Sequence, residues 1–221
     1  GLNVMGGFGE YVAVPSEQVF IMDDDISFTE ATLTEPAACC LHSLGNLQPQ
    51  IGEDLVVYGA GPMGMLHLML GRLMGLRVTV VEPDEQRQAL ASQWGAYQVT
   101  SPETIGNLKL KPDLIAVTVA APAAVTSALE WAGKGTRITL YSSFDDGVTI
   151  PLDVNQVHYK EIQITGVESR SPKDFFLASR LISKKLLDVS GLVSNVISLE
   201  ELPENLGEMP SAGTMRVVVA Q

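Results

Sequence analysis

Five short apolar runs, separated by stretches with helical spacing, constrain the fold of this chain more than any other feature. They cover residues 55–58, 78–81, 114–119, 138–141 and 162–164. Most are continuously apolar or β-branched, as strands are when helices cover both faces of a parallel sheet. The alternation of strand and helix therefore predicts a doubly wound α/β sheet.

The two ends of the chain have a different pattern. Residues 8–15 alternate like a half-exposed antiparallel strand. After Gly166 the pattern predicts a helix over 172–187, a strand over 194–198, a short helix and a final strand over 216–219. We expect these pieces to form part of a second layer beside the parallel sheet.

Charge and cysteine content exclude several classes of function. The net charge of −12 disfavours binding to nucleic acid or to an anionic membrane. The uncharged stretch 55–71 is interrupted by glycines and a proline, so strand, turn and helix explain it better than a membrane span. Cys39 and Cys40 are adjacent and form no disulfide framework, which predicts a cytoplasmic protein.

A glycine-rich turn follows the first apolar run. Gly59, Gly61 and Gly64 form a GxGxxG pattern that lies between a strand and an apolar helix. Gly59 permits a tight turn, Gly61 lets a pyrophosphate approach the backbone, and Gly64 allows close packing of helix on strand. Pro62 suits the first turn of the helix, whose free N–H groups attract phosphate.

Glu82 ends the next apolar run, about 20 residues after the glycine turn, as this motif requires. Its carboxylate can accept hydrogen bonds from the adenosine ribose of NAD and would repel the 2′-phosphate of NADP. Asp84 is the competing acid, but Pro83 indicates that the strand ends at Glu82. The pattern predicts NAD as cofactor; the alternative is a helix-capping turn with a solvated acid.

With these residues in place, the chain resembles the medium-chain dehydrogenase/reductase family, and within it the zinc-dependent sorbitol and threonine dehydrogenase branch. Besides the glycine turn, the resemblance rests on the segments 6–11, 34–36, 95–96, 133–136 and 199–203. It implies hydride transfer between a secondary alcohol, or the corresponding ketone, and NAD. It also implies a homo-oligomer that pairs through the edge of the Rossmann sheet.

The resemblance implies a GroES-like catalytic domain around a Rossmann domain. Residues 1–35 would be a remnant of the catalytic domain, 36–167 the Rossmann domain and 168–221 the return to the catalytic domain. The family's cysteine, histidine and glutamate zinc ligands would lie upstream of Gly1, so Glu35 is the one candidate ligand here. One carboxylate does not hold zinc, which takes three or four protein ligands. We therefore expect a fragment without its own zinc.

The same resemblance carries over further cofactor contacts. Met63 would touch the pyrophosphate and ribose, and Arg87 the adenosine ribose, unless Arg87 is an exposed helix arginine. Two stretches would meet the nicotinamide with their backbones: Leu140, Tyr141 and Ser142, and Val167, Glu168 and Ser169. Two departures bear on the substrate: Tyr141 stands where the family has glycine, and Ser169 lies near an arginine position of polyol enzymes.

Other reactive side chains are expected to be structural. Cys39 and Cys40 point about 100° apart on a helix and are poorly placed to share a metal. His42 follows Glu35 by two helical turns, and packing explains it better than a metal does. His67 and His158 are predicted to be structural as well.

Three functions remain open from the sequence. The first is a fragment of an NAD- and zinc-dependent dehydrogenase. The second is a naturally truncated NAD-binding module without catalysis. The third is a zinc-free reductase of the same superfamily, which would prefer NADPH and which Glu82 disfavours.

Overall fold

The computed structural model describes residues 11–109, 111–207, 211 and 213–220. Its centre is a six-stranded sheet in the order β3-β2-β1-β4-β5-β6, in which every neighbouring pair is parallel. The strands are β1 (Asp54–Tyr58), β2 (Arg77–Val81), β3 (Gln98–Thr100), β4 (Leu114–Val117), β5 (Arg137–Leu140) and β6 (Gln163–Gly166). The doubly wound sheet predicted from the apolar runs is confirmed.

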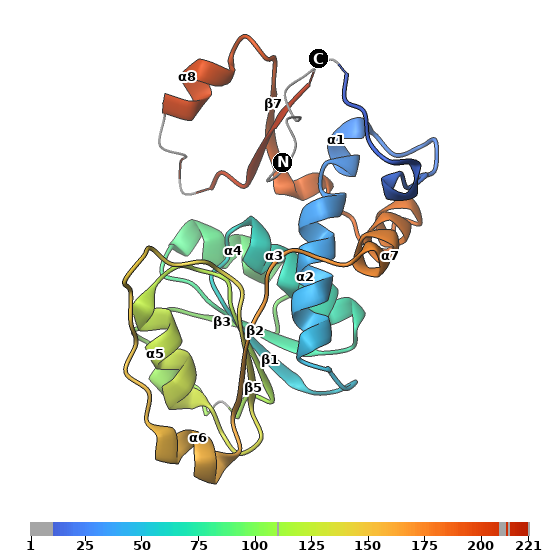
Figure 1. Cartoon of the computed structure of the whole chain (residues 1–221). Helices are drawn as coiled ribbons and strands as arrows, with labels where there is room; N and C mark the ends of the chain where they lie inside the picture. Colours follow the sequence, from blue (N-terminus) through green and yellow to red (C-terminus); the bar gives the residue numbers. More distant parts are fainter. Residues whose placement is uncertain (1–10, 110, 208–210, 212, 221) are drawn as a thin grey trace.

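Helices cover both faces of this sheet (Figure 1). On one side lie α2 (Thr34–Asn46), α3 (Pro62–Leu73), α4 (Glu85–Gln93) and α7 (Pro172–Ser183). On the other side lie α5 (Pro122–Trp131) and α6 (Val154–Lys160). Each face has its own apolar core, because successive residues of one strand point to opposite faces: Val57 enters the first core and Val56 the second.

A smaller unit flanks the sheet. It contains the parallel pair β7 (Val193–Ile197) and β8 (Arg216–Val219), with α8 (Leu202–Gly207) between them and α1 (Phe28–Ala31) nearby. Three short 3₁₀ turns complete the described elements: η1 (Ser16–Gln18), η2 (Ile105–Asn107) and η3 (Ser190–Leu192). Figure 1 shows β7 and α8 beyond one end of the large sheet.

The segment after β6 shares the first core. Ala178 and Ile182 of α7 and Leu187, Val189 and Leu192 beyond it are buried in the same cluster as α2 and α3. Residues 178–192 are therefore packed as part of the layer over the large sheet.

The structure differs from the predicted elements at several places, and helices α1 and α6 were also not predicted. No strand forms over residues 11–15, where Tyr11 is 94% exposed; residues 8–10 lie outside the described part. A strand requires a hydrogen-bonded neighbour, and residues 11–15 pair with none of the described strands. The edge strand β3 was not predicted. Helix α7 ends at Ser183 instead of residue 187, because Lys185 adopts a left-handed conformation with φ of 53°.

The junction of β1 and α3 requires two glycines. Gly59 has φ of 103°, a backbone conformation that side chains disfavour. A Cβ atom on Gly64 would overlap the backbone carbonyl oxygen of Gly59. The helix therefore starts in direct contact with the turn that precedes it.

We expect Gly64→Ala to lower the free energy of unfolding by roughly 3 kcal/mol, because the overlap forces helix and turn apart. Urea denaturation measures this change. The matched control is Gly45→Ala in α2, where an added Cβ meets nothing within 4 Å and the helix gains up to about 1 kcal/mol. Equal stability of the two variants would contradict the packing role of Gly64.

Candidate dinucleotide-binding site

The candidate site lies at the carboxyl ends of the parallel strands. The strand order reverses between β1 and β4: from β1 the chain continues to β2 and β3 on one side, and from β4 to β5 and β6 on the other. Open α/β sheets bind ligands at such a point. Gly59 follows β1 there, and Thr118 follows β4. The backbone N–H and the hydroxyl of Thr118 both donate to the carbonyl oxygen of Tyr58, at 3.0 and 2.8 Å. Thr118 borders the glycine turn, and the sequence had shown it only as part of an apolar run.

The amino end of α3 faces this point without a side-chain cap. Pro62 is its first residue and has no N–H to leave unpaired, while the N–H of Met65 donates to the carbonyl oxygen of Gly61 at 2.9 Å. Free N–H groups of a first helical turn attract phosphate. A Cβ on Gly61 would meet nothing within 4 Å, so open space lies over the turn. These residues fit a dinucleotide pyrophosphate.

Glu82 is tied to the glycine turn. Its side chain is 4% exposed, and its two carboxylate oxygens accept the N–H of Ala60 at 2.6 Å and the N–H of Asp84 at 3.0 Å. Asp84 in turn caps α4 by accepting the N–H of Arg87 at 2.9 Å. The predicted ribose ligand thus also fixes the backbone of the turn, and Arg87 lies in the first turn of α4 beside it.

Tyr141 contacts the same turn from β5. Its N–H donates to the carbonyl oxygen of Val117 at 3.0 Å, and its hydroxyl lies 3.2 Å from the sulfur of Met63. The ring packs edge-on against His67, with centroids 4.9 Å apart. Burial raises the pKa of the phenol, so Tyr141 stays neutral. Among the predicted nicotinamide residues, Tyr141 is joined to the glycine turn through Met63, while Leu140 ends β5 and Ser142 follows as a half-buried residue.

Val167, Glu168 and Ser169 follow β6 along the same edge. The N–H of Val167 donates to the carbonyl oxygen of Leu140 at 3.4 Å. Ser169 has φ of 62°, a left-handed conformation that is uncommon for a residue with a side chain. This bend precedes Arg170, whose guanidinium pairs with Glu35 at 3.4 Å.

The described residues do not fit a zinc ion. Glu35 pairs with Arg170 and also accepts the thiol of Cys39 at 3.4 Å. Burial raises the pKa of Cys39 to about 11, with the charge of Glu35 as a further cause, so the thiol stays protonated. In the described part of the chain, no group of three or more His, Cys, Asp or Glu is placed to hold a metal.

The predicted structural side chains have protein partners. His42 pairs with Asp174 through Nδ1 at 2.9 Å. His67 is fully buried and bonds the carbonyl oxygen of Met63 at 2.8 Å and the hydroxyl of Ser43 at 3.0 Å. Cys40 is buried in the first core. The burial of Cys40 and His67 agrees with the predicted structural roles, whereas His42 is partly exposed beside Asp174 and His158 is exposed.

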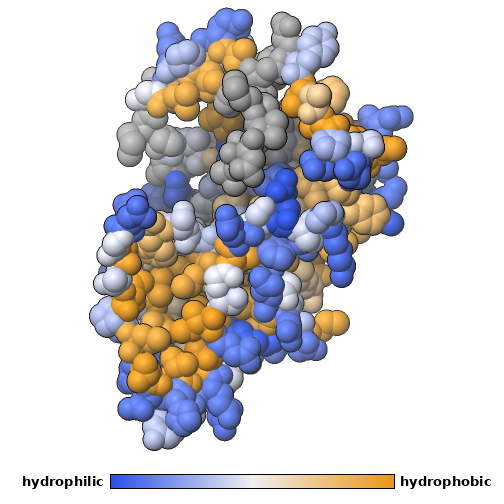
Figure 2. All heavy atoms as spheres, in the orientation of Figure 1, coloured by the Kyte–Doolittle hydropathy of each residue, from blue (hydrophilic) through white to orange (hydrophobic). Residues whose placement is uncertain are grey.

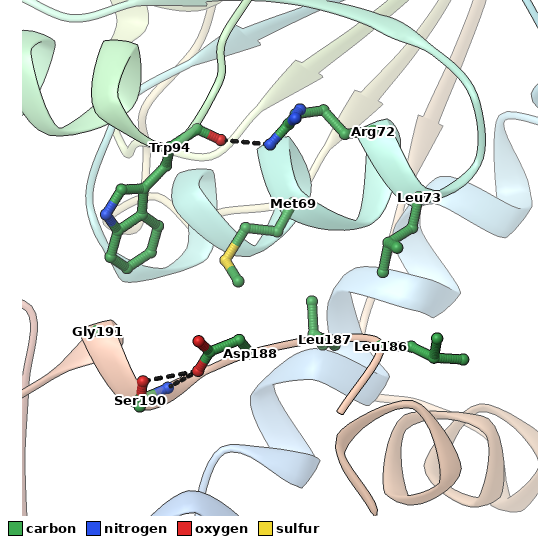
Figure 3. Close-up of a pocket in the computed structure, with 9 residues that line it drawn as sticks. All are labelled: Met69, Arg72, Leu73, Trp94, Leu186, Leu187, Asp188, Ser190 and Gly191. Carbon is green, nitrogen blue, oxygen red and sulfur yellow. Dashed lines mark hydrogen bonds between the residues drawn. The ribbon is translucent and has the colours of Figure 1, made fainter. Parts of the chain in front are cut away.

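A cavity of about 440 Å³ lies away from this edge, between α3, the end of α4 and the segment after α7 (Figure 3). Its walls are mainly the apolar side chains of Met69, Leu73, Trp94, Leu186 and Leu187. Its charged groups have partners: Arg72 donates to the carbonyl oxygen of Trp94, and Asp188 accepts the N–H and hydroxyl of Ser190. The glycine turn does not line this cavity, so it is separate from the candidate site.

Fold and glycine turn together define a dinucleotide-binding Rossmann protein. Residues 62–184 match the family model described as zinc-binding dehydrogenase. The chain therefore belongs to the zinc-binding dehydrogenase family, the medium-chain dehydrogenases. In the part of the chain that the structure covers, no helix combines the length and apolar character of a membrane span.

The relatives to which this chain is similar are dehydrogenases as well. The chain is 28% identical to L-threonine 3-dehydrogenase of Bacillus subtilis, over 99% of its own length and 65% of that protein. It is 23% identical to D-arabinitol dehydrogenase 1 of Uromyces fabae, over 99% of its own length and 66% of that protein. The chain thus spans about two thirds of the length of these relatives.

Two solved structures share the fold. A Sinorhizobium meliloti 1021 protein bound to NADP superposes with a TM-score of 0.92 at 23% identity, over 98% of this chain and 66% of the other. A short chain alcohol dehydrogenase from E. coli CFT073 in complex with NADH superposes with a TM-score of 0.90 at 21% sequence identity. This match covers 98% of this chain and 66% of the other. One structure holds NADP and the other NADH, so the fold alone does not select between them.

Burial lowers the pKa of His67 from 6.5 to about 4. Between these values the unfolded chain binds a proton that the folded chain excludes. We therefore expect the free energy of unfolding to fall as the pH drops from 6.5 to 4, with about 3 kcal/mol due to His67. Urea denaturation of wild type and His67→Gln across this range measures the difference in slope. Identical slopes would contradict the buried neutral state.

Proposed function

We propose that this chain binds NAD(H) at the glycine turn and forms the cofactor-binding part of a dehydrogenase that acts on a small secondary alcohol. The observation that supports this most is the uncapped start of α3, with open space over Gly61 at the point where the strand order reverses. Phosphate would be bound by N–H groups of the first helical turn despite the net charge of −12.

The side chains around the turn would each have a defined role. Gly61 leaves room for the pyrophosphate, and Glu82 holds the turn while its remaining lone pairs accept the ribose hydroxyls. Tyr141 and Met63 close the turn on the side of β5. NAD, when bound, accepts the hydride from the alcohol carbon.

Domain limits follow from the same proposal. Residues 36–167 would form the Rossmann domain, and residues 1–35 and 168–221 would belong to a GroES-like catalytic domain. The first limit falls in the opening turn of α2. Glu35 would lie on the catalytic side and face the substrate together with Arg170. The zinc chemistry of the family would need ligands beyond those described here.

A titration with NADH and NADPH, followed by nicotinamide fluorescence, tests the proposed cofactor. We expect NADH to bind in the micromolar range and NADPH at least about tenfold more weakly, because Glu82 repels the 2′-phosphate. Glu82→Gln keeps the size of the side chain and removes its charge, so it should narrow this difference. A preference for NADPH in the wild type would refute the role of Glu82.

The matched variant for the phosphate contact is Gly61→Ala. Its Cβ enters the open space over the turn, so we expect at least about tenfold weaker NADH binding with unchanged stability to urea. This separates it from Gly64→Ala, which acts on folding. Unchanged NADH affinity in a folded Gly61→Ala variant would exclude the glycine turn as the phosphate site.

We also propose that two copies pair through the outer edge of β6. This strand is at the end of the sheet, and an open edge can pair with another strand. Exposed apolar side chains occur on β6 and on the segment that precedes it in the chain: Val148, Leu152, Val154, Tyr159 and Ile164. Figure 2 shows apolar residues gathered over the part of the surface formed by α5 and α6.

Sedimentation should therefore show a dimer, and Ile164→Lys should dissociate it, because a charge then enters an apolar contact. The control is Ile21→Lys, which places the same charge on an isoleucine that is 93% exposed and far from β6 in sequence. A monomeric wild type would contradict this assembly.

The protein would act in the cytoplasm. Both thiols, Cys39 and Cys40, are free, which fits a reducing compartment. Fractionation of cells that produce the chain checks this assignment, and recovery in a secreted fraction would contradict it.

A further inference from the structure

A second cavity lies at the opposite, amino-terminal edge of the large sheet. It encloses about 340 Å³ between β1, β2, β3 and the loop that follows η2. Its floor is one face of the sheet, because Val56 pairs with Thr79 and Thr79 pairs with Gln98 in register. The volume is within the range of small-molecule sites, roughly 300–1,000 Å³.

The floor contains a hydroxyl that has no hydrogen-bond partner among the described residues. Thr79 is 5% exposed, and its hydroxyl makes no hydrogen bond to any residue of the described part. The hydroxyl oxygen is not fully buried, so it is exposed to the cavity that Thr79 lines. This hydroxyl is therefore a donor available to a ligand in the cavity.

Unpaired polar side chains from strand and loop residues line the same cavity. Gln98 and Asn107 line the cavity, and their amides have no hydrogen-bond partner within the described ranges. Lys109 and Lys111 line it as well, and neither forms an ion pair with a described acid.

Among the remaining charges at the rim, Arg77 and Asp54 neutralise each other, and Asp113 adds one negative charge. Arg77 donates through Nε and Nη2 to both carboxylate oxygens of Asp54, and its guanidinium lies 4.8 Å from the ring centre of Tyr97. The carboxylate of Asp113, near Lys111 in sequence, accepts the N–H of Asp54 at 2.9 Å. The two lysines therefore give the cavity a positive field on a chain of net charge −12.

We propose that this cavity binds a small multivalent oxyanion of the phosphate-ester class. Lys109 and Lys111 supply the charge, and Thr79 and Gln98 supply neutral donors at the floor. The site is distinct from the glycine turn, because Asp54 starts β1 and Tyr58 ends it. It does not depend on the proposed dehydrogenase function.

Calorimetric titration of the whole chain with inorganic pyrophosphate tests this site. We expect pyrophosphate to bind at this cavity, and the double variant Lys109→Ala/Lys111→Ala to bind it there at least about tenfold more weakly, because two charge-assisted hydrogen bonds are lost. Thr79→Val keeps the shape and removes the hydroxyl, and should weaken binding several-fold. The control Lys134→Ala/Lys173→Ala removes the same charge elsewhere and should change the affinity less than about twofold.

A further arm separates this site from the glycine turn, which also attracts phosphate. Gly61→Ala should leave unchanged the part of the pyrophosphate binding that Lys109→Ala/Lys111→Ala loses. The proposal is overturned if no binding occurs, if the two double variants lose affinity equally, or if Gly61→Ala abolishes binding that Lys109→Ala/Lys111→Ala retains. Urea denaturation confirms that each variant is folded.

Discussion

The contact between the carbonyl oxygen of Gly59 and the Cα of Gly64 determines the rest of the candidate site. It holds the start of α3 against the end of β1, at the point where the sheet order reverses. The helix then directs its first N–H groups towards the crevice above the strands. A side chain at Gly64 would displace the helix, and with it the N–H groups that favour phosphate.

Glu82 contributes both to the geometry of the glycine turn and to its charge. A carboxylate that is 4% exposed would be costly without partners, and the N–H groups of Ala60 and Asp84 supply them. The same acid therefore stabilises the turn and places a negative charge beside the expected ribose. Selection of cofactor and rigidity of the turn depend on one residue, so variants of Glu82 are best compared through the ratio of NADH to NADPH affinity.

Continuous apolar strands and the glycine spacing made the parallel sheet, α3 and the glycine turn predictable, because these depend on local sequence. Strand β3 has only three residues and forms because Thr79, Val80 and Val81 offer an open edge, a neighbour that no local pattern reveals. The bonds of Glu82 to Ala60, and of Tyr141 to Met63, join residues far apart in the chain. The ion pair of Glu35 could not be predicted for the same reason: its partner Arg170 lies more than a hundred residues further along.

The central claim is that backbone N–H groups at the start of α3 bind the cofactor phosphates. Two-dimensional ¹H–¹⁵N NMR of the chain with added NADH tests it residue by residue. We expect the largest shift changes at the amides of Gly61, Met63 and Gly64. Changes confined to other parts of the chain, with these three amides unmoved at saturating NADH, would contradict it.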